Sequence, residues 1–315
     1  ILETINLANS TVEIEGKTYK LNDSNFPTID QKNPTKLTEE EKMVIEAITD
    51  NFINSEKLIR HIRFMYAKGS MYLTFNNNLL FHACVLLNED GSFKKKRIGN
   101  KYYSGKELMD KYDEMAREAY FSQKDVDFLW FLWCNEDSTL FGKDKMTTFE
   151  RYFIDDKATH KETLSPYYKL MGEDDGTLAI KILEEFGLGA KDSHIINGHT
   201  PVKLSKGESP IKAGGKQLVI DGGFSKPYQK TTGIAGYTLT YNSYGLTLIS
   251  HKPFESVEKV INEGFDIKST KQVIETLIDR KRVADTDTGS AIKEKINNLE
   301  MLISAYSKGI VKQKD

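Results

Sequence analysis

The sequence predicts a layered α/β fold in which a helical segment separates two groups of strands. Short apolar runs with turn residues between them, as expected of strands, lie around residues 70–87 and 194–251. Apolar residues at helical spacing dominate the stretch between these groups and the charged stretch after them. Because sheets and helices must bury their apolar faces against other elements, this order indicates packed layers. The expected segments are a connector at 1–37, a helix and β-hairpin at 38–103, a helical insertion at 104–190, further strands at 191–255 and a helical tail at 256–315.

Local signals define the helix and hairpin of the second segment. Thr38 and Glu41 have the spacing of a capping box, so a helix should begin there, break near Asn54 and end at Gly69. Two apolar runs then flank NNN in SMYLTFNNNLLFHACVLL. Because Asn tolerates the left-handed backbone of a tight turn, this pattern predicts a β-hairpin.

The insertion and the later strands follow from periodicity. GKELMDKYDEMAREAYF, DVDFLWFLWC and DGTLAIKILEEFG have apolar residues at helical spacing. TLFGKDKMTTFERYFIDD is less periodic, and we expect a long ordered loop there. HIIN, QLVID, GYTLTYN and GLTLISH are predicted strands, with NSYG as a second hairpin turn.

Composition excludes several classes of function. The 315 residues carry a formal net charge of -2, which gives no electrostatic reason to expect nucleic acid or an anionic membrane as a partner. No apolar run reaches the length of a membrane span, and no signal-peptide pattern opens the chain. Cys84 and Cys134 lie in apolar surroundings, so we expect reduced core thiols and a cytoplasmic protein.

Two of the six histidines stand where a strand should give way to a loop. His82 ends the run NLLFH, and His199 follows HIIN in SHIINGHTPVK, with Gly198 before it. Functional side chains are common at such positions in α/β folds, and neutral imidazole is a good ligand for divalent transition metals. Gly198 would allow the backbone to approach a metal closely. The alternative is that each histidine simply bonds to backbone at a strand end.

Two further stretches could bind an anion. In DGGFSKPYQK, Asp221 ends a strand, and a tight double glycine precedes two lysines and an aromatic ring, a pattern that could hold a phosphate. In FGKDKMTTFERYF, three cations lie among aromatic residues. A solvated loop is the alternative in both cases. The residues concerned are Asp221, Gly222, Gly223, Lys226, Tyr228 and Lys230 in the first stretch and Lys143, Lys145 and Arg151 in the second.

These stretches resemble the class III, Firmicutes-type fructose-1,6-bisphosphatases over nearly the whole chain. The likeness is carried by RHIRFMYAKGSMYLTFNNNLLFHACVLLNEDGSF, LFGKDKMTTFERYFIDDKATHKE, PYYKLMGEDDGTLAIKILEEFGL and the region from SHIINGHTPVK to LISHKPFES. The GHTP stretch and the strand ending in IDGG are also similar to the wider calcineurin-like metallophosphoesterases. The resemblance implies the C-terminal half of a calcineurin-like metallophosphoesterase sandwich with a helical insertion and a helical C-terminal tail.

The resemblance also implies a function. In this superfamily two divalent metals activate the water that attacks phosphorus. His82 and His199 match two histidine ligands of one metal, and Mn²⁺ is the metal we expect. The substrate would be fructose 1,6-bisphosphate, which loses its 1-phosphate in gluconeogenesis. Lys203 joins the basic residues above as a candidate for the sugar phosphates.

One departure from the family pattern concerns the remaining metal ligands. The resemblance places them, with the residue that protonates the leaving group, in early motifs of the form Asp-x-His, Gly-Asp-x-x-Asp-Arg and Gly-Asn-His-Asp, which we expect this chain to lack. The chain also begins without Met, so we expect it to be the C-terminal part of a longer enzyme whose partner is its own N-terminal half. A homo-oligomer is compatible with this interpretation. The alternatives are a phosphoesterase acting on phosphoproteins or nucleotides, and a non-catalytic module that binds a sugar phosphate or a partner protein.

Overall fold

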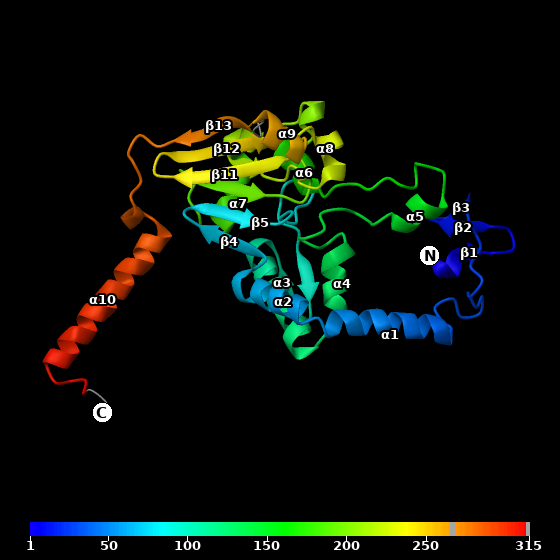
Figure 1. Ribbon diagram of the computed structural model, residues 1–315. Coiled ribbons are helices and arrows are strands. Elements are labelled where there is room, and N and C mark those ends of the chain that lie inside the picture. Colours follow the sequence, from blue (N-terminus) through cyan, green and yellow to red (C-terminus); the bar gives the residue numbers. More distant parts are fainter. Residues whose placement is uncertain (265–268, 313–315) are drawn as a thin grey trace. The chain divides into compact units, whose positions relative to one another are not determined.

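The computed structural model describes residues 1–264 and 269–312 as a mixed α/β chain (Figure 1). Two compact units are present, and each is built from two separate stretches of sequence. The first unit contains Ile1–Met71 and Asp110–Ser165, and the second contains Tyr72–Met109 and the described part of Pro166–Asp315. The stretch expected as a single helical insertion, 104–190, is therefore divided between the units.

The first unit opens with a small sheet where a connector was expected. Strands β1 (Ile5–Asn6), β2 (Thr11–Ile14) and β3 (Lys17–Lys20) form an antiparallel meander. Glu15 and Gly16, both at positive φ, make the two-residue turn between β2 and β3. The strands are short and largely polar, so their sequence gives a weak signal. Their apolar contacts come from distant residues, since Val12 and Leu21 share a buried cluster with Ile154.

Helices α1 (Glu39–Ile53) and α2 (Glu56–Lys68) follow the predicted boundaries. The capping box is confirmed, because Thr38 Oγ1 accepts from the Glu41 amide at 3.2 Å and Glu41 Oε2 accepts from the Thr38 amide at 2.8 Å. Asn54 ends the first helix, and Ser55 caps the second at its start. Local capping thus explains the break between them.

The central helices are α3 (Gly105–Ser122), α4 (Asp127–Cys134) and α5 (Thr148–Phe153). α3 begins in the second unit and continues in the first. α5 corrects the expectation of a long loop over TLFGKDKMTTFERYFIDD. The helix is only six residues long, too short for its periodicity to be evident in the sequence.

A five-stranded sheet organises the second unit, with the strand order β4-β5-β8-β10-β9. The three central strands run parallel, and the two edge strands pair antiparallel to them. The predicted hairpin is confirmed, with Asn76 and Asn77 in the turn at φ of 47° and 65°. The strands are β4 (Tyr72–Phe75), β5 (Asn78–Phe81), β8 (His194–Asn197), β9 (Ile211–Lys212) and β10 (Gln217–Val219).

A second, antiparallel sheet packs on the first through a common core. It contains β11 (Gly236–Asn242), β12 (Gly245–His251) and β13 (Ser269–Thr276). Ile196 and Leu218 from the first sheet form one buried cluster with Leu246 from the second. β13 lies within the expected helical tail and corrects it. Most of its side chains are exposed, so it lacks the apolar alternation of a half-buried strand.

Short helices complete the second unit. Helix α8 (Lys226–Thr232) takes the place of the solvated loop that was the alternative for DGGFSKPYQK, because Ser225 and Pro227 favour a helix start and Gly233, at φ 82°, ends the helix. Residues 265–268 and 313–315 of the expected tail lie outside the described residues. The remaining elements are α6 (Pro166–Glu173), α7 (Thr177–Glu185), α8 (Lys226–Thr232), α9 (Val257–Glu263), α10 (Asp287–Ser307) and the hairpin β6 (Lys96–Ile98) and β7 (Lys101–Tyr103).

Two absences apply to the described ranges. None of their helices combines the length and apolarity that crossing a bilayer requires. No disulfide joins Cys84, which is buried, to Cys134, which is half-buried.

Candidate metal-binding site at the ends of parallel strands

The three parallel strands of the second unit bring three candidate residues to one edge of the sheet. His82 directly follows β5, His199 follows β8 after one residue, and Asp221 follows β10 after one residue. β5 pairs with β8, and β8 pairs with β10. Because the carboxyl ends of neighbouring parallel strands meet at the same edge, residues 117 and 139 positions away from His82 become its neighbours.

The two histidines are in direct contact. His82 Nε2 lies 3.0 Å from His199 Nδ1, and the two ring planes meet at 68°. One ring must donate and the other accept, so at least one imidazole is neutral. Partial burial lowers the pKa of His82, although its side chain keeps an exposed part, and the nearby charge of Asp221 opposes this shift. Neutral imidazole is the form that binds metal.

The backbone at His199 is unusual. Its φ is +68°, in the left-handed region that residues other than Gly adopt uncommonly, although Asn, Asp and His do so more often than the rest. Strained backbone of this kind is concentrated at functional sites. The Gly198 amide donates to His82 O at 2.9 Å and continues the pairing of the strands. A Cβ on Gly198 would make only ordinary contacts with Asp221 and with the carbonyl oxygen of His82.

A buried network of hydrogen bonds connects the two chain segments that carry His82 and His199. Asn197 Nδ2 donates to the carbonyl of Ala83, the residue after His82, at 2.9 Å. Gln217 Nε2 donates to Asn197 Oδ1 at 2.9 Å and lies 3.1 Å from the hydroxyl of Tyr167. Because Asn197, Gln217 and Tyr167 are almost fully buried, these bonds hold the strand ends in one arrangement.

Sequence reasoning missed Tyr168 and Thr200. Tyr168, on α6, has a buried phenol next to Thr200. Burial raises the pKa of Tyr168, and the neighbouring Cys84 and Asp221 raise it further. The phenol therefore stays protonated. The sequence around Tyr168 gives no signal of this buried position, because only the packing of α6 brings the ring near Asp221.

The expectation that the chain lacks an Asp-x-His motif is wrong, because Asp192-Ser193-His194 has this spacing, but the position of the tripeptide is unsuitable for the histidine pair. His194 begins β8, at the opposite end of the strand from His199. Burial, followed by the charge of Lys216, lowers the pKa of His194 to about 4. His194 is therefore a buried residue at the other end of β8 and is not part of the histidine pair.

The double glycine after Asp221 is required by close packing. A Cβ on Gly222 would lie 2.6 Å from the Cα of Gly236, and a Cβ on Gly223 would lie 2.8 Å from the Cβ of Tyr228. Gly223 also has φ +63°, and its amide donates to Asp221 Oδ1 at 2.9 Å. The two glycines thus place α8 beside the strand end that carries Asp221.

Helix α8 presents two expected phosphate ligands together. Lys226 and Lys230 are one turn apart on this helix, and both are exposed, as is Tyr228. Within the described residues neither lysine is paired with a carboxylate. The segment after Lys203 packs against the end of α8, where Ser205 Oγ donates to the carbonyl of Thr231. Lys203, Lys226 and Lys230 are therefore held on neighbouring parts of the second unit.

The other three expected anion ligands, Lys143, Lys145 and Arg151, belong to the first unit and have carboxylate partners there. Lys143 Nζ lies 2.9 Å from Glu162 Oε2, and Arg151 Nη2 lies 3.4 Å from Glu162 Oε1. Lys145 Nζ lies 2.6 Å from Glu15 Oε1. These pairs connect separate parts of the first unit, so the side chains are neither free to bind phosphate nor the water-facing charges of a solvated loop.

The carboxylate of Glu162 is firmly ionised. Burial acts to raise its pKa, but hydrogen bonds from Lys143 Nζ and from the amide and hydroxyl of Thr147 outweigh burial and lower the pKa of Glu162 to about 2. A phosphate would have to displace this carboxylate from Lys143 and Arg151. The cluster is therefore already satisfied without a ligand.

The histidine pair fits a metal only in part. His82 Nε2 and His199 Nδ1 face each other at 3.0 Å, and both are of the imidazole nitrogen type that would hold a divalent metal. Among residues 1–264 and 269–312, however, no group of three or more His, Cys, Asp or Glu side chains could hold a metal. The pair supplies two ligands, and a complete site needs more.

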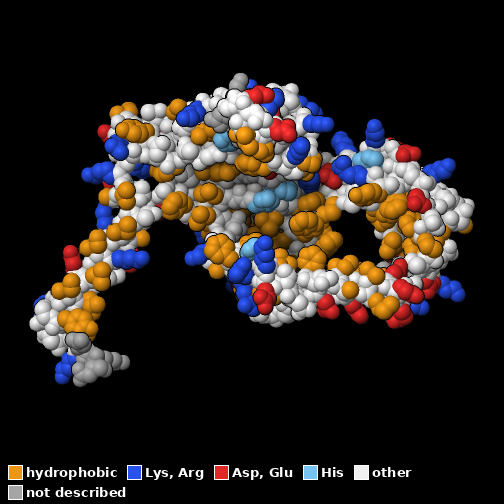
Figure 2. Space-filling model, viewed as in Figure 1, with side chains coloured by type: hydrophobic (Ala, Val, Ile, Leu, Met, Phe, Trp, Pro, Cys, Tyr) orange, Lys and Arg blue, Asp and Glu red, His pale blue; other side chains and the backbone are white. Residues whose placement is uncertain are grey.

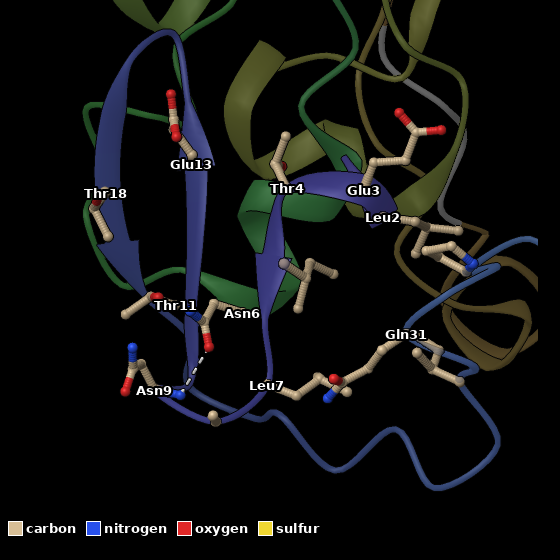
Figure 3. Close-up of a pocket in the computed structure, with 14 residues that line it drawn as sticks. Leu2, Glu3, Thr4, Asn6, Leu7, Asn9, Thr11, Glu13, Thr18 and Gln31 are labelled. Atoms are coloured by element: carbon tan, nitrogen blue, oxygen red, sulfur yellow. Dashed lines mark hydrogen bonds between the residues drawn. The ribbon is translucent and has the colours of Figure 1, made fainter.

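The pocket shown in Figure 3 lies elsewhere, in the first unit. Residues 2–34 alone line it, among them Leu2, Thr11 and Gln31, and none of the candidate site residues contributes to it. Its lining mixes amides, hydroxyls and aliphatic groups with the carboxylates of Glu3 and Glu13, and it contains no histidine, cysteine or lysine. It gives no support to a second active site.

Comparisons with known proteins identify the family of the chain. A profile of the family described as Firmicute fructose-1,6-bisphosphatase matches residues 1–308. The chain belongs to this family. A fructose-1,6-bisphosphatase class 3 protein of Clostridium beijerinckii is 56% identical over all of this chain, and its counterpart in Clostridium tetani is 57% identical over 99% of it. In each case the match covers 48% of the relative, so the chain spans about half the length of the curated relatives it matches. No solved structure matches the chain.

Proposed function

We propose that this chain forms the C-terminal part of a divalent-metal-dependent fructose-1,6-bisphosphatase with a calcineurin-like sandwich fold. The observation that carries the proposal is the contact between His82 and His199 at the ends of neighbouring parallel strands. The two stacked sheets of the second unit and the membership of the family support it. The reaction would be hydrolysis of the 1-phosphate of fructose 1,6-bisphosphate.

The two histidines would act as metal ligands through His82 Nε2 and His199 Nδ1. A bound divalent ion, which we propose to be Mn²⁺, would supply Lewis-acid stabilisation of phosphoryl charge and a more acidic water. The lowered pKa of His82 keeps its ring neutral near pH 7, as a ligand must be. The network of Asn197 and Gln217 orients both histidine segments. We propose that the remaining ligands come from a preceding N-terminal half.

We further propose that Lys203, Lys226, Tyr228 and Lys230 contact the sugar phosphates. Lys230→Ala should raise KM for fructose 1,6-bisphosphate about tenfold and change kcat little, because an exposed lysine contributes mainly to binding of substrate charge. Steady-state kinetics of the complete protein measures both constants. Lys252→Ala, at an exposed lysine after β12, is the matched control. An unchanged KM in the Lys230→Ala protein would show that Lys230 faces solvent and does not contact the substrate.

The function is tested by phosphate release from fructose 1,6-bisphosphate with Mn²⁺. The 315-residue chain should be inactive alone and active when joined to its N-terminal half, because two histidines leave most positions around a metal unfilled. Activity of the chain alone would contradict the proposed division of ligands.

Two other candidates are distinguished by the same assay. Faster release from a phosphopeptide or a nucleotide than from the sugar bisphosphate would show a different phosphoesterase. The small number of ligands in the described residues favours a second candidate for the chain taken alone, a non-catalytic module that binds a sugar phosphate or a partner. That candidate requires that no substrate is hydrolysed even after the halves are joined.

A further inference from the structure

Helix α10 carries an apolar stripe that the rest of the described chain does not cover. Ile292, Ile296, Leu299, Ile303 and Tyr306 follow one another at intervals of four, three, four and three residues. Their side chains are between 46% and 67% exposed. Figure 2 shows hydrophobic side chains along this helix, which is labelled α10 in Figure 1.

The contacts of α10 with its own chain are concentrated at its first turns. The Asn76 amide donates to Asp287 Oδ2 at 2.7 Å, and the Asp287 amide donates to Asn76 Oδ1 at 3.1 Å. Gly289 is the buried residue of the helix, pressed against the carbonyl of Val283. The helix is thus anchored at its start, whereas its later turns present the stripe to solvent.

The spacing of the stripe is that of a coiled-coil seam. A heptad assignment places Ile296 and Ile303 at a positions and Ile292, Leu299 and Tyr306 at d positions. β-branched residues at a with Leu at the central d position, Leu299, favour parallel two-stranded pairing. Leu302, 44% exposed at a g position, adds apolar surface beside the seam.

The charges beside the seam are complementary to a second copy of the same helix. Lys295 occupies a g position, and Glu300, five residues later, occupies the following e position. In a parallel two-stranded coil a g residue faces the next e residue of the other helix. Lys295 of each copy would therefore lie beside Glu300 of the other.

We propose that α10 pairs in parallel with α10 of a second copy of this chain and forms a short two-stranded coiled coil. The occupant of the stripe is a second copy because both the heptad spacing and the Lys295–Glu300 arrangement are self-complementary. The seam spans only two heptads, so the fraction of dimer should rise with protein concentration.

The seam is tested by a matched pair of substitutions measured by sedimentation velocity on the complete polypeptide that contains this chain. Leu299 and Met301 are 59% and 63% exposed on the same helix, but Met301 lies at an f position outside the seam. Leu299→Lys should weaken dimerisation at least tenfold, whereas Met301→Lys should leave it unchanged. Circular dichroism checks that both variants keep their helix content. A monomeric parent protein, or equal dimerisation in both variants, would overturn the proposal.

A charge exchange tests the partner and the orientation. Lys295→Glu places two like charges together in the parallel dimer and should weaken it several-fold. Adding Glu300→Lys in the same chain restores opposite charges and should restore the dimer. In an antiparallel dimer Glu300 would face Lys293 instead, and the double substitution would not restore dimerisation. Failure of rescue in a protein that still dimerises through Leu299 would therefore overturn the parallel arrangement.

Discussion

Replacement of His199 by Asn should lower phosphate release by the complete protein at least about 100-fold, because the substitution removes one of two neighbouring imidazoles. Asn is the informative replacement, since it tolerates the left-handed backbone that His199 adopts at φ +68°. The fold should therefore survive the change, and the loss of activity can be assigned to the missing ligand.

The measurement should include metal binding as well as activity. Titration with Mn²⁺ followed by electron paramagnetic resonance should show weaker binding in the His199→Asn protein, with its thermal unfolding midpoint little changed. His251→Asn is a suitable control, because His251 bonds to Thr238 and Ser269 across the second sheet rather than to His82. Full activity and unchanged Mn²⁺ binding in the His199 variant would refute the ligand assignment.

Replacement of Gly222 by Ala should reduce the free energy of unfolding by about 3 kcal/mol, because the new methyl group meets fixed backbone. The added Cβ would lie 2.6 Å from Gly236 Cα and 2.9 Å from Ile234 Cδ1. Backbone cannot rotate away as a flexible side chain can. The strand end at Asp221 or the start of β11 must therefore shift.

Urea unfolding followed by far-ultraviolet circular dichroism measures this loss. Gly172→Ala is the matched control, because a Cβ there meets nothing within 4 Å and Gly172 lies within α6. The control should be neutral or more stable by up to about 1 kcal/mol. Equal stabilities of the two variants would show that the region around Gly222 is more compliant than its geometry indicates.

Where short-range chemistry dominates, the sequence predicts the structure well. Thr38 with Glu41, the break at Asn54 and the end at Gly69 depend on groups within a few residues of one another. The hairpin at Asn76 and Asn77 likewise depends on which residues tolerate positive φ. Such elements form because their own backbone groups are satisfied locally.

The candidate site was predictable in part. His82 and His199 are each recognisable from an apolar run that stops at a histidine, but their contact depends on the pairing of β5 with β8. Tyr168 carries no such signal, because helix packing alone places it near Asp221. The first-unit cations, Lys143 among them, resemble anion ligands in the sequence because their carboxylate partners are distant in the chain.

Local sequence is thus sufficient for the caps, the Asn turn and the strand ends that carry the histidines, since these rest on backbone preferences and on the periodicity of apolar residues. Three-dimensional packing is needed for the small N-terminal sheet, for strand β13 and for the partners of each charged group. These features depend on contacts between residues that are not neighbours in the sequence, and some partners are more than a hundred positions apart, as Val12 and Ile154 or Lys145 and Glu15 are. Parallel strands in particular have no local turn to fix their register, so only the folded sheet brings their ends together.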